Sequence, residues 1–322
     1  MQFNSYEFIL YFLPITVLFY FLANKVKPVF GKLVIILASV VFYSMGRVNM
    51  LLYLGISMLI NYTSAKVIKK YKIESRFILA LPIIVNAGLL LYFKYLNIDP
   101  KDPDMEDRDR FILSKGHAAA GYIPTLAKRG YFPEEELKSF NHFRSPFAMH
   151  PDSKKIVGCD ASAGSLGHGL SMAVGLGLAA RQLKKDWKTV CLMGDGECCE
   201  GSVWEAAMSA AHFKLGNVIG IVDRNRFMID GTTEQVMALE PFADKWRSFG
   251  WNVLDIDGHD LDAVDDALTT AWAATDVPVL ILANTVKGKG VGFMENNVVY
   301  HYASADSAVC EKAKEEIMKG GE

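Results

Sequence analysis

Two hydrophobic patterns divide this chain. Up to about residue 98, long uncharged apolar runs follow one another, whereas beyond it short segments rich in Val, Ile and Leu alternate with segments of helical apolar spacing. Strands are predicted at 189–193, 218–222, 252–256 and 278–283, and helices at 166–183, 203–215 and 261–273. This alternation predicts an α/β fold with a parallel sheet covered by helices on both faces.

The apolar runs of the first part are each near the length that crosses a bilayer core, although the second is short. They extend over residues 8–24, 33–46, 48–65 and 77–93. A secretory signal accounts for only one of them, and a buried core hairpin is the alternative explanation. With Tyr and Lys at their edges, the runs predict about four transmembrane helices in contact with a lipid bilayer.

The charge distribution supports a division into residues 1–98 and residues 99–322. The first part holds 10 Lys or Arg and 2 acidic residues, which leaves 24 of the chain's 34 basic and 34 of its 36 acidic residues for the second. The basic loops at 25–32 and 66–76 are expected to face the cytoplasm. If all four runs insert, the second part emerges on the outer face, although a domain of this kind is cytoplasmic in type.

Candidate chemistry lies at the ends of two predicted strands. The first strand runs into Gly194-Asp195-Gly196-Glu197, and the next ends at Asp223-Arg224-Asn225. The glycines let a ligand approach the backbone, and Asp195 and Asn225 supply oxygen ligands suited to Mg²⁺. The spacing favours a magnesium-bound diphosphate site over the alternative of a structural turn.

These residues carry a resemblance to a known family. The stretch GDGECCEGSVWEAAMSAAHFKLGNVIGIVDRNRFMIDG resembles the thiamine-diphosphate motif of transketolases, in particular the amino-terminal subunit of split transketolases. SKGHAAAGY, MHPD, GSLGHGLSMAVGLGLAAR and TVKGKGVGFMENN follow the order of that family, so the resemblance covers about residues 97–302. It implies a thiamine-diphosphate-binding fold that transfers a two-carbon ketol unit between sugar phosphates. It also implies a homo- or hetero-oligomer with a transketolase C-terminal subunit.

The resemblance implies a role for each matching residue. The side chains of Asp195 and Asn225 and the carbonyl of Phe227 are the expected Mg²⁺ ligands, while Gly196 faces the diphosphate and Ile229 the thiazolium. Further expected cofactor-binding residues are Lys115, Gly164, Ser165, Leu166, Gly194 and Lys287.

The catalytic residues that the resemblance implies are His117, His150, His301 and Glu200. The histidines would line the substrate channel, and Glu200 would link the two cofactors of a dimer. Each histidine also has a structural explanation, such as a helix cap or a turn, and Tyr302 stands where the family has Gly. The family's first helical segment and its pyrimidine-binding half are missing, so we expect the chain to be inactive alone.

The first part has a resemblance of its own. FNSYEFILYFLPITVLFYFL, ILASVVFYSMGRVNMLLYLGISMLINY and LLLYFKYLN resemble the start of membrane-bound O-acyltransferases of the alginate and D-alanyl type. The acyl-transfer His of that family lies further along a longer chain, so this activity is not expected here. Because residues 91–99 fit both families, the chain is interpreted as a chimaera, produced by recombination or by an assembly error.

Composition excludes other classes of function. The five Cys have no metal-ligand spacing, which predicts reduced thiols, and the acidic second part has no basic stripe for nucleic acid. Three functions stay open: a transketolase half, an inert acyltransferase-derived membrane fragment, and a protein that binds thiamine diphosphate and Mg²⁺ without turnover. If the fusion of the two parts is genuine, the chain is expected to be a multi-pass membrane protein.

Overall fold

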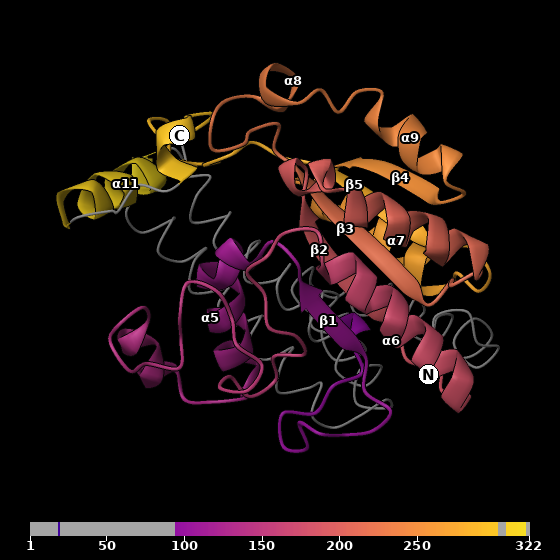
Figure 1. Cartoon of the computed structure of the whole chain (residues 1–322). Coiled ribbons are helices and arrows are strands. Elements are labelled where there is room, and N and C mark those ends of the chain that lie inside the picture. The colour runs from indigo at the N-terminus through magenta and orange to yellow at the C-terminus, as the bar shows by residue number, and fades with distance from the viewer. Residues whose placement is uncertain (1–18, 20–93, 302–306, 320–322) are drawn as a thin grey trace. The chain divides into compact units, whose positions relative to one another are not determined.

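A computed structural model describes residue 19, residues 94–301 and residues 307–319 (Figure 1). The chain divides into two compact units, Met1–Pro82 with Glu322 and Ile83–Gly321, and the described residues other than Phe19 belong to the second. The four apolar runs expected to cross a bilayer lie outside the described residues apart from Phe19. Of the acyltransferase-like fragment, the structure describes Phe19 and residues 94–98. Within the part that is described, no helix has both the length and the apolar character of a membrane span.

A five-stranded parallel sheet forms the centre of the second unit (Figure 1), with the strand order β1-β2-β3-β5-β4. The strands are β1 (Arg110–Leu113), β2 (Thr189–Gly194), β3 (Val218–Arg224), β4 (Asn252–Asp257) and β5 (Val279–Asn284). Since all strands run the same way, their carboxyl ends meet at one edge of the sheet, which is where open α/β sheets bind ligands.

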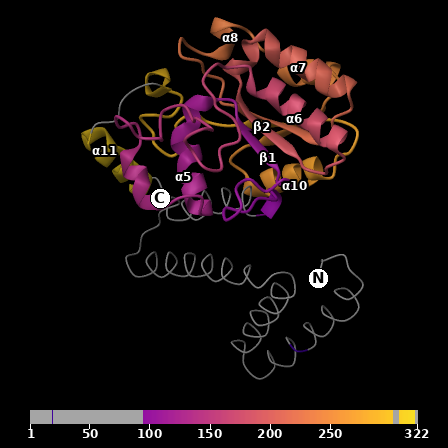
Figure 2. The ribbon, with the colours of Figure 1, turned by 60° about the horizontal axis from the view of Figure 1, so that its bottom comes forward.

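Helices cover both faces of the sheet. The first face packs against α6 (Gly169–Leu183), α7 (Gly201–His212) and α9 (Phe242–Ser248), as the positions of α6 and α7 in Figure 1 illustrate. The other face packs against α5 (Ala119–Arg129) and α10 (Leu261–Trp272), which Figure 2 shows from a second direction. The remaining elements are η3 (Gly116–Ala118), η4 (Glu134–Ser139), η5 (Gly196–Cys199), α8 (Thr233–Val236), η6 (Val298–His301) and α11 (Ser307–Lys319).

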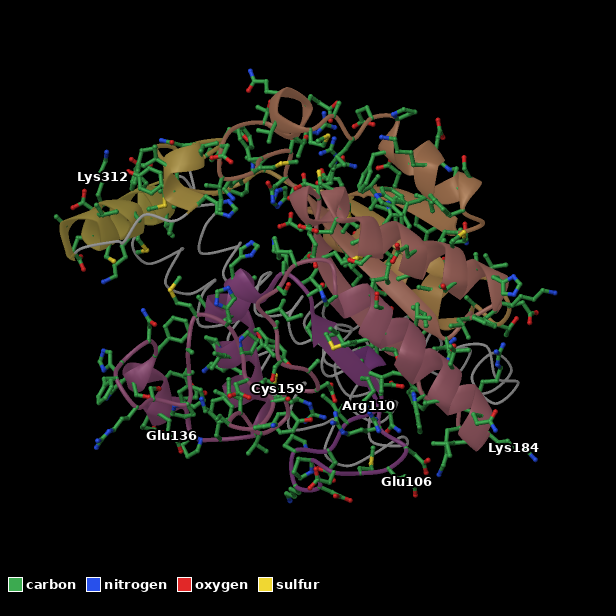
Figure 3. All side chains as sticks on the ribbon, in the orientation of Figure 1. Glu106, Arg110, Glu136, Cys159, Lys184 and Lys312 are labelled. Atoms are coloured by element: carbon green, nitrogen blue, oxygen red, sulfur yellow. The ribbon has the colours of Figure 1, made fainter. Side chains whose placement is uncertain are left out.

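The alternation of side chains along the strands divides the core into two layers. In β2, Cys191 and Met193 belong to the layer under α6 and α7, whereas Val190 belongs to the layer under α5 and α10. Figure 3 shows charged side chains such as Lys184 and Lys312 at the periphery, where both are exposed, while Cys159 is buried in the second layer. This burial explains why β2, β3 and β5 read as largely apolar runs, whereas β4 at the edge of the sheet contains exposed Asp255.

The parallel α/β fold expected from the sequence is confirmed. The helix expected at 166–183 begins at Gly169, and the one expected at 203–215 spans Gly201–His212. The hydrophobic pattern did not predict β1 or α5, which together carry one wall of the site described below.

Residues 94–98 pack as part of this α/β unit, although the sequence pattern assigned them to the membrane fragment. Lys94 Nζ lies 2.7 Å from Asp265 Oδ1, and the Tyr95 ring lies 5.1 Å from the ring of Trp272. Leu96 is buried in the core layer that contains α5 and α10. The segment therefore makes specific contacts with α10.

Candidate cofactor site

Asp195 and Asn225 follow neighbouring strands at the carboxyl edge of the sheet. Gly194 of β2 pairs with Asp223 of β3, and the Asp195 N–H donates to the Asp223 carbonyl at 3.3 Å. Asn225 is the first residue after β3. The topology thus brings together the two strand ends on which the sequence prediction of a magnesium site depends.

Asp195 is buried, and its carboxylate accepts three hydrogen bonds. Oδ1 accepts from the Gly196 N–H at 2.7 Å, while Oδ2 accepts from the Arg226 N–H at 2.5 Å and from Arg224 Nη1 at 3.1 Å. Burial raises the pKa of this carboxyl, although these three donors act against the rise. A carboxylate has about four acceptor positions, so one position is left for a cation.

The loop after β3 carries the other residues expected to hold a metal and a thiazolium. Asn225 Oδ1 accepts from the Phe227 N–H at 3.0 Å, and Asn225 Nδ2 donates to Asp223 Oδ2 at 3.3 Å. Phe227 forms an isolated antiparallel bridge with Thr232, and Ile229 at the tip is 55% exposed. The loop therefore has a fixed base and an exposed apolar tip.

Gly196 lies close to this loop. A Cβ atom at Gly196 would lie 2.9 Å from Met228 Cγ, which is closer than side chains normally approach. The absence of a side chain at Gly196 therefore lets the turn after β2 and the loop after β3 lie against each other. The sequence predicts a different role for this glycine, namely the approach of a diphosphate to the backbone, and that role stays a prediction.

A cavity of about 460 Å³ is lined by Asn225 and by four more of the predicted site residues. Lys115 and His117 come from the segment after β1, Lys287 from the segment after β5, and His301 from η6. The rings of His117 and His301 lie 5.3 Å apart. His301 lines the cavity, while its Nδ1 atom is buried and has no hydrogen-bond partner among the described residues.

His150 lies beside the same segment, because a Cβ atom at Gly116 would lie 3.1 Å from its Cδ2. It does not line the cavity itself. His117 and His301 thus lie side by side in the cavity, and His150 lies against Gly116, the residue before His117.

Positive charge dominates the electrostatics of this cavity. Burial, followed by the charges of Lys115 and His301, lowers the pKa of His117 to about 4. Burial and then Lys287 lower the pKa of His301, and burial and then Lys115 lower the pKa of Lys287. An anionic ligand would relieve this repulsion, as a diphosphate or a sugar phosphate would.

Asp223 partly neutralises the cavity. It accepts a hydrogen bond from Lys115 Nζ and another from Thr285 Oγ1. Burial opposes ionisation of this carboxyl, but the Lys115 charge and these hydrogen bonds outweigh it and lower the pKa of Asp223. Lys115 is therefore held in place by a residue that was not selected from the sequence.

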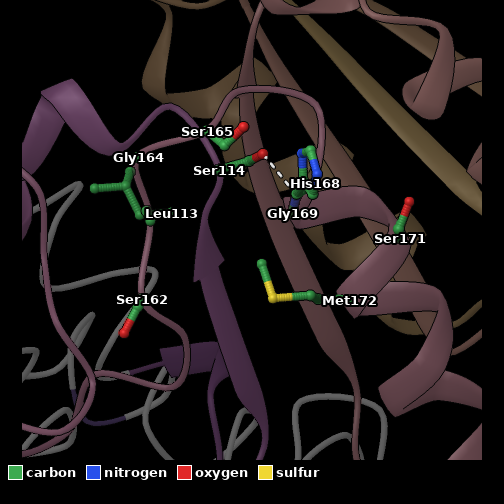
Figure 4. A pocket seen from close by; sticks show the side chains of 10 residues that line it. Leu113, Ser114, Ser162, Gly164, Ser165, His168, Gly169, Ser171 and Met172 are labelled. Carbon is green, nitrogen blue, oxygen red and sulfur yellow. Dashed lines mark hydrogen bonds between the residues drawn. The ribbon is translucent and has the colours of Figure 1, made fainter.

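A second cavity, of about 560 Å³, lies between the segment after β1 and the start of α6 (Figure 4). Gly164 and Ser165 line it, together with Ser114, His168 and Met172. Leu166 does not line it, but its carbonyl lies 3.1 Å from His168 Nδ1. Two of the three residues expected to meet the aminopyrimidine, Gly164 and Ser165, thus border a hollow.

The last predicted site residue, Glu200, is exposed at the position preceding α7. Two buried charged residues, Glu197 and Arg224, were not predicted as site residues. Both lie within the sequence motifs around Asp195 and Asn225. The sequence therefore places them near the strand ends, but it does not show that they are buried.

The chemistry of the residues at the strand ends fits a magnesium-bound diphosphate. Among the described residues, no group of three or more His, Cys, Asp or Glu is placed to hold a metal ion. The donor set at these strand ends instead combines one carboxylate, one amide and one backbone carbonyl, which are hard oxygen donors. Two lysines, Lys115 and Lys287, stand beside it, where a diphosphate would need positive charge.

Comparison with known proteins agrees with this fold. Residues 80–318 match the family described as "Transketolase, thiamine diphosphate binding domain". The chain belongs to this family. The 6-deoxy-6-sulfo-D-fructose transketolase subunit SqwG of Clostridium sp. is 41% identical over 231 residues, covering 72% of this chain and 84% of the relative. An apulose-4-phosphate transketolase subunit of Phocaeicola vulgatus is 39% identical over 235 residues, covering 73% and 83%.

Solved transketolases share the fold. The transketolase of Campylobacter jejuni superposes with a TM-score of 0.68 at 33% identity, covering 74% of this chain and 38% of that one. A transketolase mutant of Pichia stipitis in complex with fructose 6-phosphate gives a TM-score of 0.68 at 30% identity, covering 73% and 36%. This chain therefore spans little more than a third of the length of those solved transketolases.

Proposed function

We propose that this chain is the thiamine-diphosphate- and Mg²⁺-binding subunit of a split transketolase. The observation that carries the proposal is the meeting of Asp195 and Asn225 at neighbouring strand ends, beside a cavity lined by Lys115 and Lys287. The relatives named as transketolase subunits are of similar length to the matched region, which supports a partner chain that supplies the pyrimidine-binding half.

Each site residue has a proposed task. Asp195, Asn225 and the Phe227 carbonyl hold Mg²⁺, with Gly194 and Gly196 leaving room for the diphosphate, while Gly164, Ser165 and Leu166 meet the aminopyrimidine. Ile229 supports the thiazolium. When bound, thiamine diphosphate supplies the nucleophilic carbon and the electron sink for the two-carbon unit.

The cavity residues suit the handling of sugar hydroxyls and protons. With its pKa lowered to about 4, His117 is neutral near pH 7, so one ring nitrogen donates and the other accepts. His301 lines the cavity and is proposed to contact a ligand hydroxyl there, and His150 supports the segment that carries His117. Glu200 is proposed to face the second cofactor of the assembly.

The proposed substrates are anionic sugars, with sugar phosphates the first class to test. The printed names of two relatives include a sulfo sugar and a sugar phosphate, and both carry a negative charge. Lys287, whose pKa is lowered by burial and by Lys115, gains most from such a charge.

Reconstitution with a partner tests the proposal. The full chain is mixed with a transketolase C-terminal subunit, thiamine diphosphate and Mg²⁺, and transfer of a two-carbon unit between sugar phosphates is followed by mass spectrometry. We expect transfer only in the complete mixture, and none with Asp195→Ala. Transfer that persists with Asp195→Ala, or the absence of transfer with every C-terminal subunit of the matched relatives, contradicts the proposal.

A second proposal concerns residues 1–93. The four uncharged apolar runs favour a membrane-spanning fragment related to O-acyltransferases, joined to the transketolase unit as a chimaera. Uninterrupted single-molecule DNA reads across codons 75–100 from the source organism test the junction. Reads that always stop within that interval support an assembly error, and in-frame reads through it support a genuine fusion.

A further inference from the structure

Glu197 is a buried carboxylate that joins three segments of the backbone. It lies in η5, directly after Gly196, and its residue is 3% exposed. Oε1 accepts hydrogen bonds from Ser114 Oγ and from the Gly167 N–H at 2.8 Å, and Oε2 accepts from the Gly194 N–H at 3.1 Å. A charge so deeply buried is stabilised here by donated hydrogen bonds.

Each of these three donors lies next to a segment of the proposed cofactor site in the sequence. Ser114 leads into Lys115, Gly194 leads into Asp195, and Gly167 follows the loop 164–166. Ser114 Oγ also accepts from the Gly169 N–H at 3.1 Å, drawn in Figure 4, and this ties the start of α6 to the same network. One side chain therefore connects the metal-side turn, the lysine segment and the loop of the second cavity.

The backbone at Gly167 is closely packed and has no room for a side chain. Gly167 has a φ of +83°, and a Cβ atom there would lie 2.6 Å from Glu200 Cβ. Ser114 lines the second cavity and Lys115 lines the first, so the segment held by Glu197 forms the wall between the two cavities. A shift of this wall changes both cavities at once.

We propose that Glu197 is a positioning residue that sets the spacing between the diphosphate end and the aminopyrimidine end of the cofactor site. The inference rests on the proposed function. Only a carboxylate accepts at both oxygens, whereas the amide of a glutamine must direct its NH₂ group at one of the donors. The Ser114 hydroxyl can rotate to accept, but the backbone N–H groups of Gly167 and Gly194 cannot.

The test compares Glu197→Gln with wild type and with the matched control Glu205→Gln, an exposed position on α7. Hydrogen exchange of the full chain without cofactor reports directly on the backbone N–H groups. In Glu197→Gln we expect exchange of the Gly167 or Gly194 amide to accelerate at least about tenfold, because a buried donor is left unsatisfied. Glu205→Gln should exchange like wild type at both positions.

The second readout is a titration with thiamine diphosphate and Mg²⁺, followed by tryptophan fluorescence. It is run on the full chain both alone and mixed with a C-terminal subunit, because the proposed function assigns the pyrimidine-binding half to that subunit. The inference expects binding to weaken at least about tenfold in Glu197→Gln and to stay unchanged in Glu205→Gln, since a displaced wall misaligns both ends of the ligand. Equal affinities, or unchanged exchange at both Gly167 and Gly194, overturn the inference. If wild type binds no cofactor in the titration, the proposed function fails, and the exchange arm alone decides whether Glu197 holds these segments.

Discussion

The buried ion pair between Arg224 and Asp195 allows a quantitative test of how the strand ends are held together. Both side chains are 2% exposed, and the guanidinium also donates to Thr233 Oγ1 at 2.9 Å and to Glu240 Oε1 at 2.8 Å. Replacing Arg224 by Met keeps an apolar contact with Phe242, whose ring centroid lies 5.3 Å from the guanidinium, but removes these hydrogen bonds.

The expected cost follows from what is left behind. Breaking a buried pair costs about 3–5 kcal/mol because the remaining charge is uncompensated. Asp195 keeps its hydrogen bonds from Gly196 and Arg226, and Glu240 is half exposed and can be hydrated. We therefore expect Arg224→Met to lower the free energy of unfolding by about 3 kcal/mol, at the lower end of that range.

Arg247→Met is the matched control. Arg247 pairs with Asp244 on α9, but the two side chains are 49% and 70% exposed, so its loss should cost less than about 1 kcal/mol. Urea unfolding followed by tryptophan fluorescence is the assay, because all five Trp lie between residues 187 and 272. If the two variants differ by less than about 1 kcal/mol, the reasoning about the buried pair is refuted.

Three further predictions concern pH and the glycine turns. Because burial and Lys115 lower the pKa of His117 from 6.5 to about 4, the unfolded chain binds its proton more readily, and this residue's contribution to stability falls as pH drops from 6.5 towards 4. NMR titration should find the His117 ring neutral at pH 6. His117→Gln should remove this residue's contribution to the pH dependence of the free energy of unfolding. Lys115→Met should raise the pKa of Asp223, so that the stability which this carboxylate contributes is lost at a higher pH during acid unfolding; an unchanged acid midpoint contradicts this. Gly167→Ala should lower the free energy of unfolding by about 1–3 kcal/mol, because the residue has positive φ and no room for a Cβ atom. Gly164→Ala, where a Cβ atom meets nothing within 4 Å, should leave it nearly unchanged, and equal losses would count against the argument.

The sequence predicts most of the sheet because its central strands β2, β3 and β5 are largely buried. Val218–Arg224 and Val279–Asn284 are apolar runs bounded by turn residues, and their bounds were predicted to within two residues. β1 escaped prediction because it has only four residues, and α5 because Pro124 interrupts its helical pattern. Short elements of this kind form through tertiary packing.

The candidate site was predictable where topology alone decides. Asp195 and Asn225 had to meet if both follow adjacent parallel strands. The partners of Glu197 and Arg224 were not predictable in this way, because Ser114 and Glu240 come from segments whose positions depend on the packing of loops against the sheet. From the sequence alone, a charged residue inside a motif is expected to be exposed. Its burial can be recognised only when its hydrogen-bond partners are known.

The most direct test of the account is a calorimetric titration of the full chain with thiamine diphosphate, with and without Mg²⁺ and in the presence of a C-terminal subunit. We predict saturable binding that requires Mg²⁺ and that Asp195→Asn weakens at least about tenfold, since the amide removes the charge from a metal ligand. Binding that is independent of Mg²⁺, or equally strong in Asp195→Asn, would contradict a cation held between the ends of β2 and β3.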